Sequence, residues 1–134
     1  MVRKLKARKQ SGFTLLEMMI VMIIMGILLS IALPIYNQAL VRARESVLRN
    51  DLFELRKLIS QYTLDKQKAP QALDDLVSAG YIKSIPKDPI TNETNWEPHQ
   101  EDTLLSVDQQ DPGIDDVHSA SNAISSQGDA YSSW

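Results

Sequence analysis

One long apolar run dominates the pattern of hydrophobic and polar positions along this chain. Across the 21 residues from 13 to 33, only four residues interrupt it: Thr14, Glu17, Gly26 and Ser30. As a helix this run is about 31 Å long, close to the roughly 30 Å of hydrocarbon in a bilayer. The pattern therefore predicts a transmembrane helix over residues 13–34.

A second pattern follows the apolar run and has the period of a helix. Apolar residues recur in steps of 4, 3, 4 and 3, which mark one face of an amphipathic helix. These residues are Leu48, Leu52, Leu55, Ile59 and Tyr62. Because the periodicity resumes beyond Pro34, we expect that proline to kink the helix rather than end it. Together the patterns predict one bent helix from about Phe13 to Lys66, with its second half packed on its own domain.

Weaker signals follow residue 66. Pro70 and Gly80 bracket a short second helix over roughly Gln71–Ala79. Short strands are expected at Trp96-Glu97, at 103–107 and at Asp115–His118, with breaks at Pro98 and at Pro112-Gly113. We therefore expect an α+β fold, in which the long helix packs on a small antiparallel sheet.

Charge predicts the orientation of the transmembrane helix. The leader before it carries five basic residues and no acid: Arg3, Lys4, Lys6, Arg8 and Lys9. By the positive-inside rule this end stays in the cytoplasm and the rest of the chain is exported. Arg42 and Arg44 follow the helix and weaken this bias without outnumbering the leader.

A secretory signal peptide and a plain signal anchor are the alternatives for this segment. Ser30-Ile31-Ala32 has the form of a cleavage site, but the apolar core of a signal peptide is only about 7–15 residues long. A signal anchor accounts for the length and leaves Glu17 unexplained. An ionisable residue within a membrane is costly and indicates a functional site, so Glu17 needs a cationic partner.

A specific motif surrounds the start of the apolar run. Gly12-Phe13-Thr14-Leu15-Leu16-Glu17, followed by the run and Pro34, resembles the class III signal of the type IV pilin and type II secretion pseudopilin superfamily. The chain is most similar to the major pseudopilins. The resemblance implies a pilin-like fold, cleavage by prepilin peptidase between Gly12 and Phe13, N-methylation of Phe13, and a role for Glu17 in filament assembly.

Electrostatics gives Glu17 a reason for that role. Cleavage would create an α-ammonium at Phe13, one helical turn before Glu17. Inside a bundle of apolar helices each of these charges needs a counter-charge, because burying either one alone is costly. A new subunit can bring its Phe13 amine to the Glu17 of a subunit already in place. A pair within one chain is the alternative.

The resemblance also implies a place for each segment. Residues 1–12 form a cytoplasmic leader that is cleaved off, 13–34 a transmembrane and polymerisation helix, and 35–134 a periplasmic globular domain at the bacterial inner membrane. The implied function is that of a structural subunit of a type II secretion pseudopilus, which polymerises to drive protein export. Implied partners are further copies, minor pseudopilins, the peptidase/N-methyltransferase, the inner-membrane secretion platform and the lipid bilayer. A type IV pilin-like surface fibre for adhesion or motility is the alternative.

Composition narrows the function classes. Residues 65–134 hold four basic and thirteen acidic side chains, formally −9, so we expect no binding to nucleic acid. The chain has no cysteine and no Gly-rich phosphate loop, and His99 and His118 fall in no catalytic pattern. We therefore predict no enzymatic activity.

The acidic tail carries a second candidate site. Its carboxylates are the hard oxygen ligands that calcium prefers, and they include Asp108, Asp111, Asp115, Asp116 and Asp129. The tail resembles the C-terminal loop with which major pseudopilins bind calcium, and this implies Asp116, Ser119, Asn122 and Asp129 as ligands. Without a cysteine to form a disulfide, calcium would help to fasten the tail. Ordinary solvated turns are the alternative.

Overall fold

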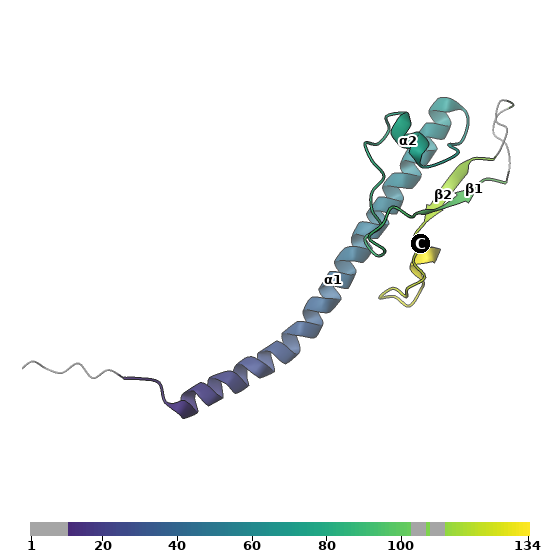
Figure 1. Cartoon of the computed structure of the whole chain (residues 1–134). Coiled ribbons are helices and arrows are strands. Elements are labelled where there is room, and N and C mark those ends of the chain that lie inside the picture. The colour runs from purple at the N-terminus through teal and green to yellow at the C-terminus, as the bar shows by residue number, and fades with distance from the viewer. Residues whose placement is uncertain (1–10, 103–106, 108–111) are drawn as a thin grey trace, which may run out of the picture. The chain divides into compact units, whose positions relative to one another are not determined.

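The computed structural model describes residues 11–102, 107 and 112–134. Its elements are the helices α1 (Leu15–Lys66) and α2 (Asp74–Ser78), the strands β1 (Glu97–Gln100) and β2 (Ile114–His118), and the 3-10 helix η1 (Tyr131–Ser133), as Figure 1 shows. The chain divides into two compact units, Met1–Gln38 and Ala39–Trp134, and α1 contributes to both. The predicted α+β class, with a long helix and a small antiparallel sheet, is confirmed.

Helix α1 has nearly the predicted extent. It begins at Leu15 rather than Phe13, ends at Lys66, and continues through Pro34. Proline cannot donate the main-chain hydrogen bond expected at its position, yet the helix continues, with good helix formers such as Leu33 and Ala39 on either side. Pro34 therefore does not end α1, and the predicted kink stays a prediction.

The second half of α1 supplies one wall of the core. The five predicted stripe residues are all buried, from Leu48 at 0% to Tyr62 at 9% exposure. They pack with Leu76 of α2, Ile114 and Val117 of β2, and Tyr131 of η1. Each fully buried aliphatic side chain contributes about 1.5–3 kcal/mol, so this stripe holds α1 to its domain.

Helix α2 is shorter than the predicted Gln71–Ala79. The Asp75 carboxylate accepts hydrogen bonds from the main-chain N–H groups of Gln71 and Ala72, so a side-chain-bonded turn precedes the helix. Gly80 ends it as predicted, with a φ of 82°. The N–H of Gly80 bonds the carbonyl of Val77 and the N–H of Tyr81 bonds that of Leu76, which is a Schellman cap.

The sheet confirms one predicted strand and corrects another. Strand β2 matches the expected Asp115–His118, and β1 pairs with it antiparallel, with Pro98 opposite Val117. Pro98 therefore lies within a strand and does not break it. Each strand of a two-stranded sheet has one edge without a neighbouring strand. A proline, which has no N–H, is tolerated there because no carbonyl of another strand needs that N–H as a donor. Trp96, expected in the strand, is instead buried in the core.

The predicted strand at 103–107 lies almost wholly outside the described residues. The expected break at Pro112-Gly113 is confirmed, because β2 begins directly after it. A Cβ at Gly113 would come within 2.4 Å of the Ala69 side chain. The chain therefore needs a glycine where it passes the end of α1.

Candidate functional sites

The first candidate site is the apolar surface of α1 in the first unit. Its large apolar side chains between Phe13 and Leu33 are all exposed, from 44% at Met18 to 80% at Leu15. Among the described helices only α1 is long and apolar enough to cross a membrane; its most apolar window has a mean hydropathy of 2.7 and is 0% buried. The described residues leave this apolar surface uncovered, which fits a single-pass membrane-anchored protein.

Thr14 and Glu17 form the start of this helix together. The main-chain N–H of Glu17 donates to Thr14 Oγ1 at 3.1 Å, and that of Met18 donates to the Thr14 carbonyl at 3.1 Å. Thr14 is thus the N-cap, and Thr14-Leu-Leu-Glu17 has the pattern of a capping box. Sequence reasoning missed this local role, although the spacing of threonine and glutamate was a sufficient signal.

The Glu17 side chain lies where a negative charge is favourable. It is the third residue of α1, and the N-terminus of a helix carries a partial positive charge. Its carboxylate has no ion pair within the part of the chain that the structure describes. Gly12 and Phe13 precede the helix and are exposed, so the predicted cleavage point is outside regular structure.

The second candidate site lies where the C-terminal tail contacts α1, at a buried acid. Glu45 is 6% exposed. One carboxylate oxygen accepts hydrogen bonds from the Ser126 N–H at 2.6 Å and the Tyr131 hydroxyl at 2.9 Å, and the other accepts one from the Ser126 hydroxyl at 2.6 Å. We call Glu45, Ser126 and Tyr131 the C-terminal clasp. Burial alone raises the pKa of Glu45, but the bonds from Ser126 and Tyr131 outweigh it and hold the pKa below its ordinary value.

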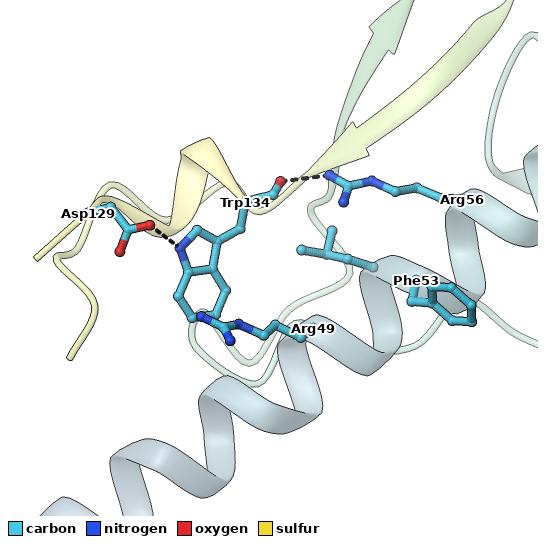
Figure 2. A pocket seen from close by; sticks show the side chains of 6 residues that line it. Arg49, Phe53, Arg56, Asp129 and Trp134 are labelled. Atoms are coloured by element: carbon cyan, nitrogen blue, oxygen red, sulfur yellow. Dashed lines mark hydrogen bonds between the residues drawn. The ribbon is translucent and has the colours of Figure 1, made fainter. Parts of the chain in front are cut away.

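Trp134 adds a second attachment of the tail to α1. Figure 2 shows the Arg49 guanidinium across the indole, 4.3 Å from the ring centre, and Asp129 accepting the indole N–H at 2.8 Å. Arg56 donates to the main-chain oxygen of Trp134 at 2.7 Å. A cavity of about 410 Å³ lies among these residues and Phe53. The tail therefore contacts α1 at Glu45, Arg49 and Arg56, over about three helical turns.

The residues predicted to bind calcium have other partners. Asp116 accepts the Arg56 Nε–H at 2.5 Å, Ser119 donates to buried Asp88 at 2.5 Å, and Asp129 accepts from the Ser125 hydroxyl and from Trp134. Asn122 is exposed.

Asp116, Ser119 and Asp129 thus have partners within the protein, whereas calcium takes six to eight oxygen ligands. Within the described residues no three Asp, Glu or His side chains cluster as metal ligands. Asp108 and Asp111 lie outside the described residues. Calcium binding stays a prediction.

Sequence reasoning also missed Glu45. It continues the apolar stripe by one further step of three residues before Leu48, and this is a position where a charge is unexpected. A glutamate at a core position of an amphipathic helix indicates a buried polar contact. Which residues supply that contact could not be read locally, because they lie 81 and 86 residues further along the chain.

Comparison with known proteins identifies the family. The prokaryotic N-terminal methylation motif matches residues 7–33. The type II secretion system core protein G of Vibrio cholerae is 34% identical over 81% of this chain and 88% of its own length. This chain belongs to the core protein G family of type II secretion.

Other members of the family have similar identities. Core protein G of Aeromonas hydrophila is 36% identical over 66% of this chain and 73% of its own length, and that of Escherichia coli K12 is 35% identical over 63% and 70%. No solved structure matches the chain significantly. The resemblance to pseudopilins is thereby confirmed over most of the chain.

Proposed function

We propose that this chain is a structural subunit of a type II secretion pseudopilus, assembled from the inner membrane to drive protein export. The observation that carries the proposal is the uncovered apolar surface of α1, with one carboxylate that has no ion pair among the described residues. Membership in the core protein G family supplies the secretion context. The role is structural, and no catalytic step is assigned to any residue.

Processing prepares the subunit for assembly. Prepilin peptidase cleaves between Gly12 and Phe13 and so removes the basic leader, and the same enzyme methylates the new amine of Phe13. The methylation motif over residues 7–33 supports this step, and so does the exposed, non-helical chain at residues 12 and 13. Before cleavage, the basic leader keeps the N-terminus on the cytoplasmic side of the membrane. The second unit is periplasmic both before and after cleavage.

Assembly then pairs charges between subunits. The ammonium on Phe13 of an incoming subunit meets the Glu17 carboxylate of a subunit already in the filament, and this fixes the axial register of the two helices. The apolar faces of neighbouring α1 helices replace lipid around the pair. Minor pseudopilins and the inner-membrane secretion platform are the further partners of this filament.

The mass of the mature protein tests the proposal. In protein isolated from membranes we expect loss of residues 1–12 and the gain of one methyl group. Electron microscopy of sheared filaments then separates short periplasmic fibres from the long surface fibres of a type IV pilin. The family assignment does not support this alternative better than the pseudopilus. A functional protein that keeps its basic leader would contradict the polymer mechanism and leave a simple membrane-anchored domain.

A further inference from the structure

The C-terminal tail is held to α1 by contacts within the chain. Glu45 binds the tail at both Ser126 and Tyr131, through three hydrogen bonds of 2.6–2.9 Å. We propose that Glu45 fastens the C-terminal tail to α1, and that the tail of this chain therefore keeps its fold without calcium. The clasp takes the fastening role that the resemblance implied for a metal ion.

The burial of Glu45 makes loss of the clasp costly. A carboxylate that is 6% exposed is strongly destabilising without partners. Among the described residues its hydrogen-bond donors, Ser126 and Tyr131, belong to the tail, and the charge of Arg49 on α1 adds to their effect. The bonds join residues separated by 81 and 86 positions. Closing so long a loop is what a disulfide or a metal ion does in other small exported domains.

The tail also satisfies its own carboxylate. The Ser125 hydroxyl and the Trp134 indole N–H both donate to Asp129, and these bonds hold the Asp129 pKa below its ordinary value. The Ser125 N–H donates to the Asp129 carbonyl at 2.7 Å, and Gly128, with a φ of 97°, allows the turn between them. Donors of this chain thus already bind both oxygens of this carboxylate.

Thermal unfolding of the full chain in detergent micelles tests the proposal. We expect the wild-type Tm in millimolar calcium and in EGTA to agree within about 2 °C. Glu45→Gln should lower the Tm by about 5–10 °C in both buffers, because it removes a charged acceptor from a buried site. Glu54→Gln is the matched control, since it changes the same charge on an exposed side chain of the same helix. It should shift the Tm by no more than about 2 °C.

Hydrogen exchange locates the effect. In Glu45→Gln, well below its Tm, main-chain amides of residues 123–131 should exchange at least about tenfold faster than in Glu54→Gln, while those of α1 around Leu55 stay protected. Tyr131→Phe removes one bond and keeps the ring contact with Trp134, 5.1 Å between centroids. The Tm loss of Glu45→Gln/Tyr131→Phe should therefore be smaller than the sum of the single losses.

Two results would overturn the proposal. One is a wild-type Tm that falls by more than about 5 °C in EGTA, which would show that a metal ion fastens the tail. The other is tail exchange in Glu45→Gln no faster than in Glu54→Gln. Neither result depends on filaments, because the clasp is a property of the folded second unit. Failure of the proposed assembly role would leave these measurements unchanged.

Discussion

Replacing Glu17 by glutamine removes a charge and keeps nearly the same shape. The carboxylate has no ion pair among the described residues, and the capping bond to Thr14 uses the main-chain N–H of Glu17. Glu17→Gln therefore leaves this bond in place. Within a single chain the substitution should cost only the favourable interaction with the helix N-terminus, about 0.3–1 kcal/mol.

The loss within a filament should be much larger. Removing one member of a buried ion pair costs about 3–5 kcal/mol, because the remaining charge stays in apolar surroundings. In the proposed assembly, the remaining charge is the Phe13 ammonium of the neighbouring subunit. Since 1.4 kcal/mol changes an equilibrium about tenfold, the subunit concentration needed for polymerisation should rise about 140- to 4,000-fold.

Pelleting of sheared filaments from cells with graded subunit expression measures this concentration, and mass spectrometry confirms that the variant is cleaved and methylated. Thr14→Val is the control, because it removes the cap and keeps the carboxylate. Loss of an N-cap costs about 1 kcal/mol, so this variant should need only about fivefold more subunit. If the two variants impair polymerisation equally, or if Glu17→Gln polymerises like wild type, then Glu17 serves the helix start and not an intersubunit pair.

Three further predictions concern the second unit, each measured by thermal unfolding of the full chain. Leu52→Ala, at 2% exposure, should cost about 2–5 kcal/mol by opening a cavity in the core, whereas Phe53→Ala at 65% exposure should cost far less. Burial and the nearby Asp88 raise the Asp51 pKa, so the stability of the fold falls as pH rises above the unfolded pKa of 3.8. Asp51→Asn should therefore raise the Tm at pH 7, and this gain in Tm should shrink on acidification. The hydrogen bond with Asp115 raises the His99 pKa, so the small stabilisation by this pair is complete below the unfolded pKa of 6.5 and is lost as pH rises through the folded pKa. If the Tm of His99→Gln falls as steeply over this pH range as that of wild type, the prediction is wrong.

The helical part of the fold was predictable because its signals are local. The apolar run and the 4-3-4-3 stripe predicted α1 to within two residues at its start, and Gly80 predicted the end of α2. The sheet was harder, because its pairing depends on residues far apart in sequence. The missing N–H of proline predicts a strand break at Pro98, and only the two-stranded context of β1 explains why Pro98 is tolerated.

The candidate sites divide in the same way. Gly12, Phe13 and Glu17 lie within six residues, so a short motif was enough to find them. The contacts of the tail could not be predicted, because the partners of Asp116, Ser119 and Asp129 are set by how the tail packs on α1 and on the loop at Asp88. The types of these side chains could be read from the sequence, but their hydrogen-bond partners could not.

Cleavage at Gly12 would place two positive ends next to each other at the start of α1. The helix N-terminus carries about half a positive charge, and the Phe13 ammonium would lie two residues before the first helical residue, Leu15. These positive ends repel each other, and Glu17 offsets their charge. If each ammonium instead pairs with the Glu17 of the neighbouring subunit, every helix start inside the filament has the same compensation and the helices gain a fixed register. Such a row of pairs leaves one Glu17 carboxylate without an ammonium at the end where subunits are added. That unpaired carboxylate, in apolar surroundings, favours the next processed subunit over an unprocessed one, which has no ammonium at Phe13 to offer.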